Sequence, residues 1–353
     1  MDLQLKRAYA QLRNNDLDGL VLSSQPNISY LSGFLSHEAY LLISPEGNFY
    51  FTDSRYIEAA KIGLKKNFDI KKINGSFAET IACACKSLGL VKVGFEERNL
   101  SYAEYKKIKE KLSRDIAFIP THSLIDGLRQ IKRQDELRKI RKAVEITVKA
   151  LEFIQQLILP GKRELEVAGE LERFIRLSGA WGCAFDIIVA SGPNSSFPHH
   201  KTSQRKIKNN ELVLIDMGVD YLGYKSDLTR VFFLGKIDFL ARKIYDIVLR
   251  AQGRAIREVK ENVLISEVDG ASRQYITEQG YGKLFGHNLG HGVGLEIHEL
   301  PSISPRENNR LKSGMVFTVE PAIYLPHKFG VRLEDMVLLG HQGCEVLSGA
   351  LHK

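Results

Sequence analysis

Hydrophobic and polar residues alternate along the first third of the chain in a pattern that predicts strands interleaved with helices. Short apolar runs are typical of strands, and apolar residues at helical spacing are typical of helices. The expected strands span residues 19–22, 40–43, 48–51, 92–95 and 116–119, and the expected helices span 1–16, 54–66, 77–88 and 102–112. Pro45-Glu46-Gly47 predicts a hairpin between the second and third strands. This order predicts a mostly parallel or mixed sheet with helices on its faces.

The rest of the chain carries longer amphipathic stretches. The expected helices span residues 135–158, 164–177, 239–259 and 265–278. In the first of them, Leu137, Ile140, Val144 and Val148 recur at intervals of three and four, which is the spacing of one helix face. A polar, turn-forming stretch over residues 120–133 precedes this helix. We therefore expect a small α/β domain over residues 1–125 and an α+β domain over residues 126–353.

A β-hairpin is expected over residues 212–233, and it contains two aspartates inside apolar runs. If its turn is centred between Tyr221 and Leu222, Asp216 lies directly opposite Asp227. Directly opposed residues have Cβ atoms about 4.5–5.5 Å apart. Two carboxylates at that distance repel each other, so the pair needs a cation or a shared proton.

A second hairpin repeats this arrangement with glutamates. Residues 316–320 and 331–334 are expected as strands flanking a loop that contains Gly330. Centring this hairpin on residue 327 places Glu320 opposite Glu334.

Between the two hairpins lies a stretch rich in glycine and histidine, residues 286–294. His287 and His291 have the spacing of a helical zinc motif, but Asn288 follows the first histidine and the glycines make a helix implausible. The stretch is better interpreted as a loop running into a strand, with one histidine on a metal. Four carboxylates and one imidazole suit two divalent ions about 3.5–4 Å apart.

Other interpretations of the aspartates remain open at this point. A single aspartate in a strand is often an ordinary residue beside a turn, and Arg230 could neutralise either Asp216 or Asp227. An ionised group inside an apolar run is costly unless it is paired or coordinated, so the sequence favours ligands.

Strand alternation places Arg332 on the same face as Glu334, with Asp335 facing away. Arg332 then orients a carboxylate ligand, binds substrate, or forms a plain salt bridge with Glu334.

Three further histidines surround this region in the sequence. His199 and His200 close a loop ahead of the first hairpin, and His298 follows the glycine-rich stretch. Histidines on a loop are often only exposed polar residues, but histidine is also the usual proton shuttle near neutral pH. Both interpretations carry equal weight for each of them.

The composition, the charge distribution and the absence of certain motifs exclude several classes of protein. The 353 residues are 44% hydrophobic and 26% charged, with a formal charge of +8. The basic residues are dispersed and no interleaved aromatic motif accompanies them, so no nucleic-acid partner is expected. The sequence lacks the G-x-S-x-G elbow of serine hydrolases and the G-x-x-x-x-G-K-[ST] phosphate-binding loop.

Location is also constrained by composition. No stretch approaches 18 uninterrupted apolar residues, and the N-terminal segment has no apolar signal core. Cys83, Cys85, Cys183 and Cys344 include no C-x-x-C and are interpreted as free thiols of a reducing compartment. We therefore expect a cytoplasmic protein with no membrane association.

In these residues and their order, the chain resembles the metallopeptidases with the pita-bread catalytic domain, in the aminopeptidase P and prolidase branch. The matching motifs of the second domain are Ile215-Asp216-Met217-Gly218, Ser226-Asp227-Leu228-Thr229-Arg230, Gly290-His291-Gly292-Val293-Gly294, Val319-Glu320-Pro321 and Val331-Arg332-Leu333-Glu334-Asp335. Residues 190–200 also match, as do residues 30–34 and 52–56 of the first domain. The resemblance covers nearly the whole chain.

The resemblance implies a two-metal exopeptidase that removes an N-terminal residue ahead of proline. The family usually works with Mn²⁺ or Co²⁺, and Zn²⁺ or Fe²⁺ are alternatives; Mn²⁺ is our expectation. By the same resemblance, Asp216 and Glu334 bridge the two ions, Asp227 completes one site, and His291 with Glu320 completes the other.

The resemblance also implies how the residues act. The cations provide a hydroxide near neutral pH that attacks the scissile carbonyl, and Glu320 takes the proton of the nucleophile. His199, His287 and His298 match histidines around the substrate, one of which stabilises the oxyanion while the others position the peptide. Arg332 matches an arginine behind the ligands.

The expected partners are short proline-containing peptides and a second copy of the chain in a homodimer, whose first domain limits access to the site. Dipeptides and longer peptides with proline second both remain open. Two alternatives from other classes are a metal-free hydrolase on the same fold, as in creatinase, and a non-catalytic binding scaffold. Methionine aminopeptidase shares the second domain, but a first domain of this type is not expected there.

Overall fold

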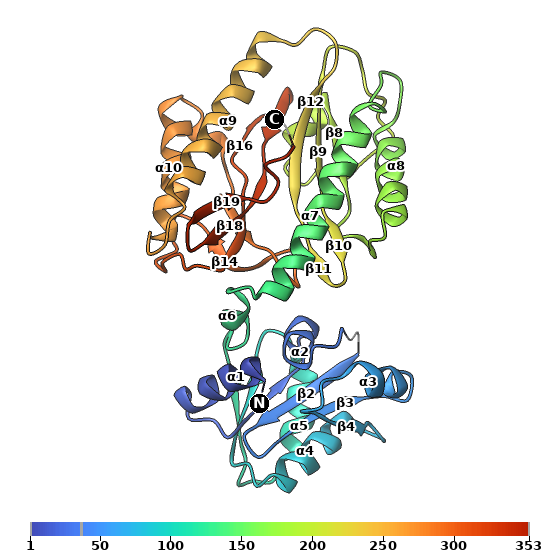
Figure 1. The fold of residues 1–353 in the computed structure, drawn as a ribbon, viewed down its shortest axis with the longest axis vertical. Coiled ribbons are helices and arrows are strands. Elements are labelled where there is room, and N and C mark those ends of the chain that lie inside the picture. Colours follow the sequence, from blue (N-terminus) through green and yellow to red (C-terminus); the bar gives the residue numbers. More distant parts are fainter. Residues whose placement is uncertain (1, 36–37, 352–353) are drawn as a thin grey trace. The chain divides into compact units, whose positions relative to one another are not determined.

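The protein is described by a computed structural model that covers residues 2–35 and 38–351 (Figure 1). The chain divides into two compact units, and the division falls between Arg129 and Gln130. This break lies beside the boundary at 125/126 expected from the sequence, and α6 (Asp126–Arg129) closes the first unit. Over the described ranges, no helix combines the length and apolarity needed to cross a membrane.

The first unit is built on one six-stranded sheet with the order β4-β3-β2-β1-β5-β6. β1 is antiparallel to β2 and parallel to β5, so the sheet is mixed, as expected. The elements are α1 (Leu3–Asn14), β1 (Gly19–Leu22), α2 (Gln25–Ser32), β2 (Ala39–Ser44), β3 (Gly47–Thr52), α3 (Ile57–Gly63), β4 (Asp69–Lys72), α4 (Phe77–Ser87), β5 (Lys92–Glu96), α5 (Tyr102–Lys111) and β6 (Ala117–Thr121). Ile81 of α4 and Ile108 of α5 pack with strand residues such as Phe51 in one hydrophobic core.

Three elements of this unit were not expected from the sequence: α2, β4 and the short helix α6, which lies in the expected polar connection. The helix α2 buries six of its eight residues, so it has no polar face to reveal a helical period. The strand β4 has the burial pattern of an exposed edge and no apolar alternation. Pro120, which was expected in the connection, lies inside β6 instead. β6 is an edge strand, where a residue without an N–H is tolerated.

In the second unit, the strands of the described residues form four sheets, and helices flank them (Figure 1). Its helices are α7 (Gln134–Gln155), α8 (Glu164–Leu177), α9 (Phe239–Glu258) and α10 (Ile265–Glu278), with short 3-10 turns η1 (Gly192–Ser196) and η2 (Gly282–Leu284). The four long helices match the expected ranges closely. α7 and α8 lie on one side of the strands and α9 and α10 on the other (Figure 1).

The strands are β7 (Gly182–Cys183), β8 (Ile188–Ser191), β9 (Leu212–Met217), β10 (Val219–Tyr221), β11 (Tyr224–Lys225), β12 (Leu228–Phe233), β13 (Gly290–Gly292), β14 (Glu299–Ile303), β15 (Val316–Val319), β16 (Ala322–Leu325), β17 (Phe329–Arg332), β18 (Asp335–Gly340) and β19 (Gly343–Val346). They form the four sheets β11-β10-β7, β12-β9-β8, β14-β13-β15-β18-β19 and β16-β17.

The register of the first hairpin differs from the expected one. Asp216 pairs with Thr229, not with Asp227. The reason is the turn: Leu222 and Gly223 both take positive φ angles, so the turn is centred between them and not one residue earlier. Asp227 is therefore two residues away from the position opposite Asp216. Because successive side chains along a strand point to opposite faces, a shift of two residues leaves Asp216 and Asp227 on the same face of the sheet.

The second hairpin keeps the expected register but is broken into two parts. Val319 pairs with Asp335 and Ala322 pairs with Arg332, which is the alignment obtained by centring on residue 327. The part nearest the turn is β16 with β17, and Gly330 belongs to β17 and not to the loop. Glu320 and Glu334 therefore lie in the gap between the two parts.

Candidate metal centre

Three of the four acidic residues lie just outside the ends of strands, and the fourth lies within a strand. Asp216 is in β9, one residue before its end, and Asp227 directly precedes β12. Glu320 directly follows β15, and Glu334 lies between β17 and β18. At Glu320 and Glu334 the main chain leaves the hairpin ladder: the N–H of Glu320 donates to Leu289, and that of Glu334 to Thr229. The breaks therefore turn both glutamates toward neighbouring strands.

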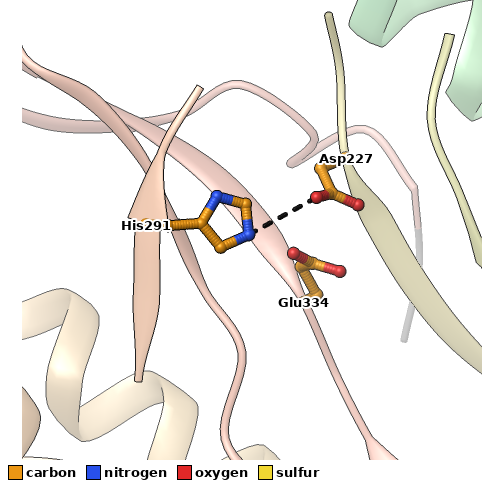
Figure 2. Close-up of side chains that lie close together, drawn as sticks. All are labelled: Asp227, His291 and Glu334. Carbon is orange, nitrogen blue, oxygen red and sulfur yellow. Dashed lines mark ion pairs between the residues drawn. The ribbon is translucent and has the colours of Figure 1, made fainter. Parts of the chain in front are cut away.

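Three side chains from three separate strands converge on one point, as Figure 2 shows for Asp227, His291 and Glu334. One ligand atom from each lies within 4.8 Å of the other two. The His291 Nε2 atom is 3.5 Å from Asp227 Oδ2 and 3.3 Å from Glu320 Oε1. The other ring nitrogen, Nδ1, is 3.2 Å from the Gly292 carbonyl oxygen, so both ring nitrogens face oxygen acceptors. Burial lowers the pKa of His291, but the hydrogen bond and charge of Glu320 outweigh burial and raise it, which favours a protonated ring; a metal ion would take the place of the hydrogen on Nε2.

Burial and mutual repulsion dominate the electrostatics of this cluster. Burial raises the pKa of Asp227 well above its usual value, and the charges of Glu334 and Asp216 raise it further. The pKa of Glu334 is raised well above its usual value by burial and by Glu320 and Asp216. Carboxylates held this way need either protons or cations.

The negative charges of the other two carboxylates, Asp216 and Glu320, are better balanced by positively charged neighbours. Burial raises the pKa of Asp216, and the nearby Arg332 reverses only part of that shift. At Glu320, burial is outweighed by the hydrogen bond and charge of His291, so the pKa of Glu320 is lowered. Glu320 is therefore ionised near neutral pH even without a metal.

Arg332 is buried behind the carboxylates and binds several of their neighbours. Its Nη2 donates to Asp216 Oδ2 at 2.5 Å, and its Nη1 donates to the Tyr324 hydroxyl at 2.6 Å. Its Nε donates to the Thr229 hydroxyl at 3.1 Å, which in turn donates to Glu334 Oε2 at 2.7 Å. The salt bridge considered with Glu334 is therefore formed with Asp216, and Arg332 reaches Glu334 only through Thr229.

Arg230 does not neutralise the metal-facing aspartates. Its Nη2 donates to Asp335 Oδ1 at 2.7 Å, and the Ser348 hydroxyl donates to the same oxygen. Asp335 faces away from the cluster, as strand alternation predicted, and pairs with Arg230 in the interior.

The histidines divide into two groups. His199, His287 and His298 line the same cavity as the carboxylates, whose volume is about 850 Å³. The His298 ring packs edge-on against His291 with centroids 4.2 Å apart, and burial lowers the pKa of His298. His200, although it borders the cavity, pairs through Nε2 with Glu164 at 2.9 Å.

His287 has both ring nitrogens engaged. Nδ1 lies 2.7 Å from the Asn288 carbonyl oxygen and therefore carries the hydrogen. Nε2 then accepts from the Tyr324 hydroxyl at 3.3 Å. Burial lowers the pKa of His287, which keeps the ring neutral in this arrangement.

Sequence reasoning missed the hydroxyl groups that support the ligands. Thr229 joins Arg332 to Glu334, Tyr324 joins Arg332 to His287, and the Thr318 hydroxyl donates to Glu320 Oε1 at 3.1 Å. The register would have revealed Tyr324, because Tyr324 and Arg332 lie on the same face of the β16–β17 pair. Thr229 and Thr318 have no comparable signal, since threonine is ordinary in strands.

Comparison with known proteins defines the class. Residues 138–341 match the model of metallopeptidase family M24, and residues 4–131 match the creatinase/prolidase N-terminal domain. The chain belongs to metallopeptidase family M24, which confirms the expected resemblance and fold class.

Individual relatives match over nearly their whole length. The Xaa-Pro dipeptidase of Pyrococcus furiosus is 37% identical over 350 residues, which is 99% of this chain and 98% of that protein. Among solved structures, the Xaa-Pro dipeptidase from Bacillus anthracis has a TM-score of 0.94 at 39% identity, covering 98% of this chain and 96% of that one. The X-Pro aminopeptidase from Thermotoga maritima has a TM-score of 0.88 at 36% identity, covering 96% and 97%.

The residues present fit the divalent ions that the family implies. Oxygen-rich donors with one imidazole are typical of such ions. Asp216 Oδ1 is buried and accepts no hydrogen bond within the described part of the chain, so it is available as a ligand atom. The pKa values of Asp227 and Glu334 also indicate ligands: burial raises them, neighbouring carboxylates raise them further, and a bound cation would favour the ionised forms against both effects.

Proposed function

We propose that the chain is a two-metal exopeptidase that hydrolyses the peptide bond between an N-terminal residue and proline. The observation that carries the proposal is the convergence of Asp227, His291 and Glu334, with Asp216 and Glu320 beside them, at the wall of one cavity. The relatives named Xaa-Pro dipeptidase and X-Pro aminopeptidase support the proline specificity.

In this proposal five side chains would hold the two ions. By the family resemblance, Asp216 and Glu334 would be shared between them, Asp227 would belong to one ion, and His291 and Glu320 would belong to the other. The ions supply Lewis acidity at the scissile carbonyl and lower the pKa of water enough to provide a nucleophile near neutral pH. Arg332 and Thr229 fix the two bridging carboxylates from behind through the hydrogen bonds described above.

Glu320 is the proposed proton acceptor. Its lowered pKa keeps it ionised at neutral pH, so it can take the proton that the nucleophile loses and deliver it to the leaving nitrogen. The Thr318 hydroxyl and the His291 ring hold Glu320 Oε1 in place.

His298 and His199 are the proposed contacts to the substrate. The lowered pKa of His298 leaves it neutral, and a neutral imidazole N–H can donate to the negative charge that develops on the carbonyl oxygen. His287 instead holds Tyr324 through Nε2, so we assign it to positioning the Tyr324–Arg332 pair.

We further propose Mn²⁺ as the native ion and a homodimer, which rest on the resemblance seen in the sequence, and a cytoplasmic location, which rests on the free cysteines and the apolar pattern of the chain. The division of roles, with a catalytic second domain and a first domain that limits access to a partner's site, also rests on the resemblance. Metal analysis of the purified protein and its mass in solution test the first two points.

Peptide hydrolysis tests the function directly. Metal-stripped protein is reloaded with Mn²⁺ and offered Leu-Pro, Leu-Pro-Gly and, as a control, Leu-Ala and Leu-Ala-Gly. The proposal predicts cleavage of at least one proline peptide and little cleavage of the alanine peptides. The ratio of the two proline peptides separates a dipeptidase from an aminopeptidase. Full activity after exhaustive chelation would instead support a metal-free hydrolase, and no cleavage of any peptide would support a binding scaffold.

A further inference from the structure

An amide side chain lies within the apolar inner face of α9. The other buried residues of this helix are alanines, isoleucines, one valine and one tyrosine, but Gln252 is fully buried among them. A buried amide is costly unless it is hydrogen-bonded. Gln252 therefore marks a specific contact on this helix.

The contact is with the two strands that lead into the metal centre. The Nε2 group of Gln252 donates to the Val319 carbonyl oxygen at 2.9 Å and to the Leu333 carbonyl oxygen at 3.0 Å. Val319 directly precedes Glu320, and Leu333 directly precedes Glu334. One side chain thus joins the main chain beside two of the proposed metal ligands, which are 14 residues apart in sequence.

These two carbonyl groups lie where the backbone hydrogen bonds of the second hairpin are interrupted. The adjacent N–H groups, those of Glu320 and Glu334, donate to Leu289 and Thr229 on other strands. The main chain at both glutamates is therefore hydrogen-bonded to other segments and not across the hairpin. Gln252 binds the same two segments from the α9 side, so the gap between the segments has a fixed width.

We propose that Gln252 is a positioning residue for the metal centre: its amide sets the spacing between the main-chain segments that carry Glu320 and Glu334. This inference rests on the ligand assignment of the proposed function. A second explanation is that Gln252 only satisfies two buried carbonyls, in which case its loss lowers stability and leaves metal affinity unchanged.

Mn²⁺ titration of metal-stripped protein separates the two explanations. Gln252→Met keeps the length of the side chain and removes both donors. Groups behind metal ligands typically contribute 10- to 100-fold to affinity, so Gln252→Met is expected to weaken Mn²⁺ binding by about tenfold or more. Gln252→Glu, which in its protonated form keeps one donor, is expected to give a smaller loss and also serves if the methionine variant does not fold.

Two controls match the substitution. Val248→Ala removes buried volume from α9 in the hydrophobic core that also contains Val319 and Leu333, so it lowers the melting temperature without touching these carbonyls. Gln274→Met changes an exposed glutamine of α10. Both should leave Mn²⁺ affinity within about threefold of wild type. The inference is overturned if Gln252→Met loses stability like Val248→Ala while binding Mn²⁺ as tightly as wild type.

The outcomes also distinguish this inference from the proposed function. A wild-type chain that binds Mn²⁺ but cleaves no proline peptide contradicts the substrate assignment and leaves the test of Gln252 valid. A wild-type chain that binds no divalent ion contradicts both.

Discussion

The guanidinium group of Arg332 lies 2.5 Å from Asp216, and its Nε is 3.1 Å from the hydroxyl of Thr229, which hydrogen-bonds Glu334. One arginine therefore holds both of the carboxylates proposed to bridge the ions. Its planar group binds three partners at fixed angles, which an ammonium group cannot reproduce.

We expect Arg332→Lys to keep the charge and lose this geometry. The predicted result is a decrease of kcat by at least about tenfold and of Mn²⁺ affinity by about 10- to 100-fold, with the circular dichroism spectrum of a folded protein. Steady-state kinetics and metal titration measure the two effects. Kinetics and metal affinity equal to wild type would show that Arg332 does not support the ligands.

The raised pKa values of Asp227 and Glu334 predict how metal binding depends on pH. Because the folded-state pKa values are raised, these groups stabilise the metal-free protein most at low pH, and this contribution is lost as the pH rises through the raised values. Cations replace the lost protons at higher pH. The increase in melting temperature on adding Mn²⁺ should therefore be larger at pH 8 than at pH 5.5.

Differential scanning calorimetry of stripped and loaded protein measures this difference. In Asp227→Asn, one of the repelling charges is absent, so the stripped variant should lose less stability between pH 5.5 and pH 8 than the stripped wild type. An equal Mn²⁺ effect at both pH values would contradict the electrostatic account.

Glu164 organises the loop that carries His199. Its buried carboxylate accepts hydrogen bonds from Ser191, Asn194 and Ser203 as well as from His200. Burial raises its pKa, but these donors outweigh burial and the pKa of Glu164 is lowered. Its stabilising contribution is therefore present above the usual carboxyl pKa and is lost as the pH falls through the lowered value.

Glu164→Gln should lower the stability by about 2–4 kcal/mol, since the donors around it lose a charged acceptor. We also expect KM to rise more than kcat falls, because the loop borders the cavity. Glu170→Gln on the same helix removes only an exposed pair with Arg173 and should change stability by less than about 1 kcal/mol. Thermal unfolding of the two variants compares them; similar losses would argue against the role of Glu164.

Tyr324 offers a test of the hydrogen bonds between Arg332 and His287. Tyr324→Phe removes the hydroxyl that accepts from Arg332 and contacts His287. We predict about a tenfold loss of kcat/KM, comparable to other groups behind metal ligands. Tyr9→Phe, which removes a hydroxyl bound to Asn48 in the first unit, serves as the control and should retain full activity. Equal activity in both variants would show that the Tyr324 hydroxyl does not contribute to catalysis.

The sequence predicted the ligand-bearing strands more reliably than their exact pairing. The Glu320–Glu334 register was correct because the turn of that hairpin is symmetric about residue 327. The Asp216–Asp227 register was wrong because it depended on which two residues adopt positive φ, and one of them, Leu222, rarely does. The error did not affect the metal site, since a shift of two residues keeps the same face.

Contacts between distant segments were beyond sequence reasoning. The sequence left the partners of Arg230 and Arg332 open, because strand alternation gives the face of a side chain but not the segment opposite it; only the fold selects Asp335 for Arg230 and Asp216 for Arg332. The contacts of Gln252 could not be predicted for a similar reason. A polar residue at an inner position of a helix indicates that a partner exists, but it does not identify that partner.

Equilibrium Mn²⁺ binding to metal-stripped wild type and to Glu334→Gln decides whether Asp216, Asp227, His291, Glu320 and Glu334 together hold two ions. We expect two ions per wild-type chain. We expect Glu334→Gln to remain folded, to bind fewer ions or bind them far more weakly, and to lose cleavage of proline peptides. Identical stoichiometry and affinity in the two proteins would contradict this assignment.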